Sequence, residues 1–227
     1  MAELVVSIVV FTAFHALPST PLRARLIDLL GREVFLWAFS IASVLLFAWV
    51  WIAYRTTVPD TLLWATGPFV RWLSALAMLP ALALIALAFA QRPRVLLTAE
   101  TALARPDATT GVVRITRHPL LWGVGLWGIV HLVNNGDAPS LVFFGYVTAL
   151  ALGGTWPIDR RRARLLGERW PEIERRTSNL PFLAIAQRRN RFEAGELSLP
   201  ALGAAAALWL MLLLLHHWLF GVPIVAP

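Results

Sequence analysis

The chain has 227 residues, of which 58% are hydrophobic and only 15% are charged, and its mean hydropathy is +0.67. This composition excludes an ordinary soluble globular protein and is typical of an integral membrane protein. The net charge of +7 comes from arginine without any lysine, and its clustering in loops favours contact with anionic lipid over binding of nucleic acid. Cysteine is absent, which excludes disulfides and thiolate metal sites and leaves histidine as the chief soft metal ligand.

Six apolar segments predict an all-α, polytopic transmembrane bundle of about six helices, in a single domain that covers residues 1–227. The segments lie near 2–17, 35–54, 69–90, 119–134, 139–156 and 200–220. Several are shorter than the roughly 20 residues that span a bilayer, so short or tilted helices are expected. The first segment has Glu3 in place of a basic start and no small-residue cleavage site, which predicts a retained helix rather than a signal peptide.

The arginines alternate between connecting segments. Most of them lie in 18–34, 91–118 and 157–199, whereas 135–138 and the tail after Gly221 contain none. By the positive-inside rule, both termini are expected to face outward and the three arginine-rich loops are expected to face the cytoplasm.

Two of these loops contain further predicted helices. The pattern over Leu96 to Leu103 predicts a short helix in the second loop. The third loop begins with a basic amphipathic helix over 159–167, for which two alternatives are open. It lies on the anionic inner leaflet, or it is a solvated helix without a lipid role.

The fourth apolar segment contains His131, which is a candidate ligand because burying a polar ring without a partner costs free energy. Trp127 shares its helix face. Gly123, Gly125 and Gly128 thin the same helix, which would admit a flat macrocycle or permit close helix packing.

Two more histidines are candidates near the cytoplasmic ends of helices. His15 has Phe11 and Thr12 on its own face at i−4 and i−3. It is either a ligand or an interfacial residue bonded to Ser19 or to a carbonyl that Pro18 leaves free. His118 directly precedes a proline at a helix start, where it is either a ligand or a boundary residue.

The remaining histidines, His216 and His217, are adjacent and point about 100° apart on a helix. Their place near the outward end predicts interfacial anchoring. The chain has no HExxH, GxSxG, Walker or GxGxxG motif, so metalloprotease, serine hydrolase and nucleotide-binding functions have no support.

Short motifs follow one another in order from the first helix to Phe182. They are Phe14-His15 with Ser19, Gly31-Arg32, Thr116-Arg117-His118-Pro119-Leu120, Leu126-Trp127, His131-Leu132, Asn135-Gly136-Asp137, Asp159-Arg160-Arg161 and Thr177-Ser178-Asn179-Leu180-Pro181-Phe182. Together they resemble the NnrU-like family, which is associated in bacteria with denitrification and the nitric oxide response and is related to zeta-carotene isomerase. The resemblance implies a location in the bacterial cytoplasmic membrane.

The resemblance also implies a cofactor and its ligands. The isomerase looks like an enzyme that binds haem b through two histidines. By their positions in the shared motifs, these ligands correspond to His15 and His131 in this chain. A cysteine that serves there as an alternative ligand corresponds to Gly128, so this chain cannot use a sulfur ligand. The implied function is either a redox-gated isomerisation of a polyene double bond or a haem role in nitrogen-oxide chemistry with a redox partner.

Helix depth suggests other ligand pairs. His131 lies about 18 Å along its helix from the cytoplasmic start, near the outer end, whereas His15 lies near the inner end of the first helix. Depth alone would pair His15 with His118, with Arg23 and Arg117 holding haem propionates, or His131 with one of the two outer histidines.

A more distant resemblance gives an alternative function. Isoprenylcysteine and phospholipid methyltransferases have a similar layout, with an Arg-His-Pro helix start, a hairpin of short helices and a basic stretch like 167–172. Those enzymes have adjacent acidic residues after the hairpin, where this chain has Trp156-Pro157-Ile158-Asp159-Arg160. The alternative implies S-adenosylmethionine bound near His118 and no haem.

Overall fold

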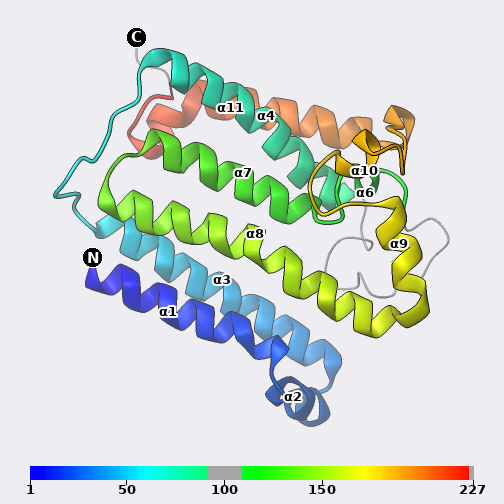
Figure 1. Cartoon of the computed structure of the whole chain (residues 1–227). Helices are drawn as coiled ribbons and strands as arrows, with labels where there is room; N and C mark the ends of the chain where they lie inside the picture. The colour runs from blue at the N-terminus through cyan, green and yellow to red at the C-terminus, as the bar shows by residue number, and fades with distance from the viewer. Residues whose placement is uncertain (91–108, 225–227) are drawn as a thin grey trace. The chain divides into compact units, whose positions relative to one another are not determined.

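The computed structural model describes residues 1–90 and 109–224, and every regular element in these ranges is helical (Figure 1). Six helices match the six predicted apolar segments: α1 (Ala2–Ala16), α3 (Arg32–Thr56), α4 (Pro68–Ala90), α7 (Pro119–Asn134), α8 (Ala138–Leu166) and α11 (Leu199–Phe220). Four of them, α3, α4, α8 and α11, are long and apolar enough to cross a membrane, and α1 and α7 are shorter apolar helices. The predicted all-α transmembrane fold class is confirmed.

Shorter helical elements fill the connections. They are α2 (Leu22–Leu30), α6 (Val112–Ile115), α9 (Trp170–Arg176), α10 (Leu183–Ala186) and 3-10 turns at Leu17–Ser19, Gly167–Arg169 and Ala194–Glu196. The segment 18–34, predicted as a loop, therefore contains α2. Its mean hydropathy is low because of the charged residues, but leucine, arginine and alanine are all good helix formers. α2 ends at Gly31, whose φ of 80° suits glycine. The helix predicted over Leu96 to Leu103 lies outside the described residues.

The predicted end of the fifth apolar segment at residue 156 was wrong. α8 continues through Pro157 to Leu166, so the basic stretch after Asp159 forms its last turns and not a separate helix. An interior proline removes one hydrogen bond and crowds the carbonyl four residues earlier, here that of Gly153, and apolar helices tolerate this. With 29 residues the helix is about 43 Å long, more than the roughly 30 Å of bilayer hydrocarbon. The helix is therefore long enough for its charged end to lie beyond the apolar layer.

The chain divides into two compact units, which are described separately. The first unit comprises Met1–Trp64 and Asn135–Tyr146, and the second comprises Ala65–Asn134 and Val147–Pro227. In the first unit α1 and α2 pack against α3, and in the second unit α7 and α11 pack against α4. The single domain over 1–227 stays a prediction.

Two glycines of α7 permit close packing in the second unit. A Cβ atom added at Gly123 would lie 2.6 Å from Cγ1 of Ile85 and 2.8 Å from the carbonyl oxygen of Ala81 on α4. A Cβ atom added at Gly125 would collide with the side chain of Leu152 on α8. The sequence left two alternatives for the glycines of α7, space for a flat macrocycle or close helix packing. For Gly123 and Gly125 the structure supports close packing.

We expect Gly123→Ala to lower the thermal unfolding temperature of the purified protein in detergent, because the new methyl group would push α7 away from α4. Overpacking of this kind costs about 1–3 kcal/mol. The matched control is Gly153→Ala on α8, where an added Cβ meets no atom within 4 Å. That change should be neutral or stabilising. Equal unfolding temperatures for Gly123→Ala and the wild type would contradict the packing.

Much of the apolar surface of α3 and α11 faces outward. Only 11% of the most apolar window of α3 and 6% of that of α11 is buried. Trp37 and Trp218 are 69% and 84% exposed. Such surfaces are favourable in hydrocarbon and unfavourable in water, which indicates a lipid environment for the chain.

Candidate functional site

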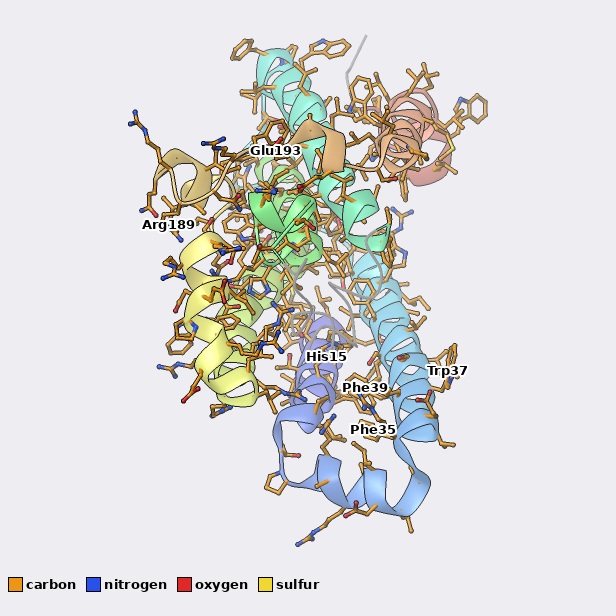
Figure 2. All side chains as sticks on the ribbon, turned by 90° about the vertical axis from the view of Figure 1, so that its right-hand side faces the viewer. His15, Phe35, Trp37, Phe39, Arg189 and Glu193 are labelled. Carbon is orange, nitrogen blue, oxygen red and sulfur yellow. The ribbon has the colours of Figure 1, made fainter. Side chains whose placement is uncertain are left out.

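His15 lies among aromatic rings where α1 meets α3. Its ring stacks on that of Phe11, one turn earlier on α1, with centroids 4.4 Å apart, and lies 5.7 Å from the ring of Phe39 on α3. Figure 2 shows His15 and Phe39 on facing sides of the two helices. The predicted neighbour Phe11 is thus confirmed. Thr12 instead shares a hydrogen bond of 2.7 Å with the hydroxyl of Tyr146.

The ring of His15 has no hydrogen-bond partner in the part of the chain that the structure describes, and its Nδ1 is buried. The alternative prediction, a bond to a carbonyl near Pro18, therefore has no support. A buried polar atom that stays unsatisfied costs on the order of 1–3 kcal/mol. A ligand that accepts the lone pair of a ring nitrogen would remove this cost.

The motif Asn135-Gly136-Asp137 has a structural role in the first unit. The Asp137 carboxylate accepts hydrogen bonds from the backbone nitrogen and hydroxyl of Ser140, both 2.8 Å long, and so caps the start of α8. The Ser140 hydroxyl also bonds to that of Tyr54, 3.0 Å away. A side chain at Gly136 would collide with the carbonyl of Trp64. This motif orders the turn before α8.

His131 lies on α7 in the second unit, and its ring is held by its own helix. Its Nδ1 donates a hydrogen bond of 2.8 Å to the carbonyl oxygen of Trp127, whose ring centroid is 4.6 Å away. Because a carbonyl can only accept, this bond places the imidazole lone pair on Nε2. Histidine ligands of metals commonly have their second nitrogen fixed in this way.

His216 and His217 lie near the end of α11, and their predicted anchoring role stays a prediction. Nδ1 of His216 donates to the carbonyl oxygen of Val222 at 2.7 Å, beyond the helix end at Gly221. The His217 side chain is exposed.

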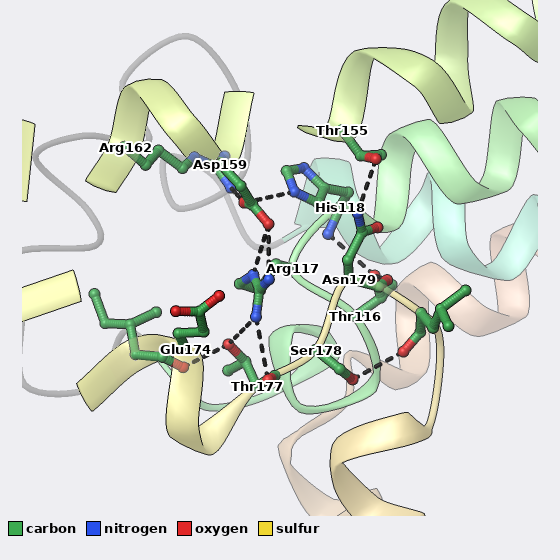
Figure 3. Close-up of polar contacts among 12 residues, drawn as sticks. Thr116, Arg117, His118, Thr155, Asp159, Arg162, Glu174, Thr177, Ser178 and Asn179 are labelled. Carbon is green, nitrogen blue, oxygen red and sulfur yellow. Dashed lines mark hydrogen bonds and ion pairs between the residues drawn. The ribbon is translucent and has the colours of Figure 1, made fainter. Parts of the chain in front are cut away.

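Arg117 and His118 bind one carboxylate, that of Asp159 on α8 (Figure 3). Oδ2 of Asp159 accepts from Nη2 and Nε of Arg117 at 2.7 and 3.1 Å, and Oδ1 accepts from Nε2 of His118 at 2.8 Å. The three side chains are only 7%, 2% and 13% exposed, in the order Arg117, His118, Asp159. We call these three residues the Asp159 cluster.

The segment that follows α9 completes the surroundings of the Asp159 cluster. Nη1 of Arg117 donates to the carbonyl oxygen of Thr177 at 3.1 Å. The Asn179 amide donates to the Thr155 hydroxyl at 2.8 Å and accepts from the indole nitrogen of Trp122 at 3.1 Å. Residues 177–179 thereby connect the start of α7 to the end of α8.

Burial lowers the pKa of His118, and the bond to Asp159 only partly opposes this effect. The ring is therefore neutral at neutral pH and donates its Nε2 proton to the carboxylate. Asp159 was missed as a site residue. One feature of the sequence could have identified it, because Asp159 is a single acidic residue directly before a run of arginines, where an apolar segment ends.

The structure brings together only some of the predicted site residues. Arg117 and His118 meet at Asp159, and His131 lies elsewhere on α7. Arg23, on α2, belongs to the first unit with His15. Cofactor binding by these five residues stays a prediction. In the described ranges, no three histidine, aspartate or glutamate side chains gather as they would around a single metal ion.

Comparisons with known proteins give the chain a context. The family model described as NnrU protein matches residues 3–224. The 15-cis-zeta-carotene isomerase of Arabidopsis thaliana is 39% identical over 80 residues, which are 35% of this chain and 22% of that protein. The isomerase of the same name from Zea mays is 34% identical over 82 residues, or 36% and 22% of the two chains. Each match thus covers about a fifth of the curated relative's length. No solved structure matches this chain.

Proposed function

Since this chain belongs to the NnrU protein family, we propose that it is a membrane haem b protein that isomerises a double bond of a polyene. Two relatives are named as isomerases of 15-cis-zeta-carotene, which supports this class of reaction. His15 and His131 are the residues that would hold the haem, the pair that the family resemblance implies.

The setting of His15 is the observation that carries the haem proposal. Its buried Nδ1 has no partner among the described residues, and aromatic rings of Phe11 and Phe39 surround it. Coordination of the imidazole to iron would compensate for burying it in an apolar place. The Nδ1 bond of His131 places the imidazole lone pair on Nε2, the nitrogen that would coordinate iron.

When bound, ferrous haem would supply electron density that lowers the barrier to rotation about a conjugated double bond. The chain's own residues prepare the site. The carbonyl of Trp127 fixes the orientation and tautomer of His131. The rings of Phe11 and Phe39 pack against His15 and limit its rotation. Gly128 offers no sulfur atom, so the proposed ligands would hold the haem through imidazole nitrogen.

An optical spectrum of the purified full chain tests the proposal. We expect a Soret band that shifts on reduction with dithionite, and we expect cis-to-trans conversion of a carotenoid polyene only with the reduced protein. Lack of a Soret band, in a folded preparation from cells with ample haem, would reject haem binding. A reducible Soret band without conversion of the polyene would instead favour a haem role in nitrogen-oxide chemistry.

A further inference from the structure

An open cleft of about 510 Å³ lies in the second unit, beside the Asp159 cluster. Arginines line one part of it, namely Arg117, Arg175 and Arg189, and Leu180 and Leu183 line another. We propose that this cleft binds the phosphate headgroup of an anionic phospholipid, whose acyl chains lie along the neighbouring apolar side chains. The cleft contains neither proposed haem ligand, so a negative result for lipid binding would leave the proposed function intact.

Arg189 provides a positive charge that no carboxylate neutralises within the described ranges. Its Nη1 donates to the carbonyl oxygens of Glu174, Arg175 and Thr177 at 3.0, 2.6 and 3.0 Å, and its Nε donates to Oε1 of Gln187 at 2.8 Å. All four acceptors are uncharged amide oxygens, so they hold the guanidinium in place and leave its charge available to an anion. Phosphate oxygens match the fork of guanidinium donors.

The other charged groups at the cleft differ in their availability. Arg175 is exposed and forms no ion pair in the described part of the chain, whereas Arg117 is paired with Asp159. Glu174 is the acidic side chain that lines the cleft, and it too is exposed. Two arginines therefore face a single carboxylate, and the balance favours an anion.

The surrounding segment strengthens this preference. Residues 160–191 contain ten arginines and three glutamates, so they account for the whole formal net charge of +7. A basic segment next to transmembrane helices attracts anionic headgroups before any specific contact forms. The cleft would then select among lipids that the segment has already concentrated.

Apolar side chains stand exposed at the same place. Leu180, Phe182 and Phe192 are 53%, 52% and 50% exposed, and the two phenylalanine rings lie 6.4 Å apart. Phe182 has a φ of 63°, which is unfavourable for a bulky residue, and its backbone nitrogen donates to the carbonyl of Ile115 at 2.8 Å. The backbone thus holds an aromatic ring outward at some energetic cost, which suits contact with acyl chains.

The cleft also lies at a suitable depth. Arg117 is two residues before Pro119, the first residue of the apolar helix α7. Arg117 lines the cleft, so the cleft lies next to the start of an apolar helix, where lipid headgroups would meet the hydrocarbon.

Native mass spectrometry of the full chain in detergent tests the proposal with phosphatidylglycerol and phosphatidylcholine of identical acyl chains. We expect the wild type to retain phosphatidylglycerol over phosphatidylcholine. Arg175→Gln and Arg189→Gln should each reduce this retention several-fold. The matched control is Arg188→Gln, because Arg188 is exposed on the same segment but does not line the cleft. It should retain the lipid like the wild type.

Each other outcome would overturn the proposal. Equal retention of both lipids would show that charge does not select the ligand. An equal loss in Arg188→Gln would show diffuse attraction in place of a cleft. Displacement of phosphatidylglycerol by millimolar inorganic phosphate would indicate a site for soluble phosphate. If Arg189→Gln fails to fold because carbonyl contacts are lost, Arg175→Gln still decides, since no bond of the described fold depends on its side chain.

Discussion

Replacing His131 with alanine is expected to remove the Soret band of the purified protein, with haem content falling on the order of tenfold or more. The imidazole is fixed by the Trp127 carbonyl with its lone pair on Nε2, and an alanine methyl group cannot replace it. Without cysteine in the chain, a thiolate cannot take its place. The measurement is the ratio of Soret to protein absorbance, with and without dithionite, in monodisperse preparations.

Other histidine variants define the ligand pair. His15→Ala should have the same effect, because the ring between Phe11 and Phe39 is the proposed second ligand. His217→Ala is the control, since that exposed side chain should leave the spectrum unchanged. His118→Ala should also be silent, because its Nε2 already donates to Asp159. Loss of the band in His118→Ala together with a silent His131→Ala would replace our pair by His15 and His118.

The second large effect is expected from Asp159→Asn. This change removes the charge that compensates Arg117 and places an amide where three N–H groups of Arg117 and His118 now meet one carboxylate. An uncompensated charge among side chains that are 13% exposed or less costs about 3–5 kcal/mol. The thermal unfolding temperature in detergent, followed by tryptophan fluorescence, should therefore fall by on the order of 10 °C.

An exposed ion pair supplies the control for this prediction. Glu172 and Arg176 are 3.1 Å apart and more than half exposed, so Glu172→Gln should change the unfolding temperature little. The double variant Arg117→Met with Asp159→Leu should be less destabilised than Asp159→Asn, because it removes the Arg117 charge together with its partner. Arg162, which is 3.9 Å from the Asp159 carboxylate, loses this partner in both variants and so does not affect the comparison. Equal unfolding temperatures for Asp159→Asn and Glu172→Gln would contradict the role of the Asp159 cluster.

Local patterns predicted the parts of the fold that depend on neighbours in sequence. The bounds of α7 at 119–134 agree with the prediction, because proline favours the first helical position and a polar turn follows. Phe11 stacks on His15 because residues four apart share a helix face. α8 was cut short because hydropathy falls at Pro157, although the backbone remains helical.

Contacts between distant residues were not predictable in the same way. Asp159 is 42 residues from Arg117, so no local pattern relates them, and the arginine run around Asp159 suggested a lipid surface instead. The glycines of α7 were equally compatible with a bound macrocycle and with close helix packing. The absence of a side chain does not indicate which group occupies the space beside the helix. The positions of Ile85 and Leu152 decided for packing at Gly123 and Gly125.

The hairpin of α7 and α8 is fixed at two points, and this spacing limits how its length can change. His118 bonds to Asp159, and Gly125 meets Leu152, so the two contacts are separated by seven residues on either side. Seven residues make almost two helical turns, which keeps both contacts on one face. A single inserted or deleted residue between them would rotate one partner by about 100° and shift it by about 1.5 Å. Homologues should therefore vary in length at the turn after Asn134 or beyond Asp159, and not between these contacts.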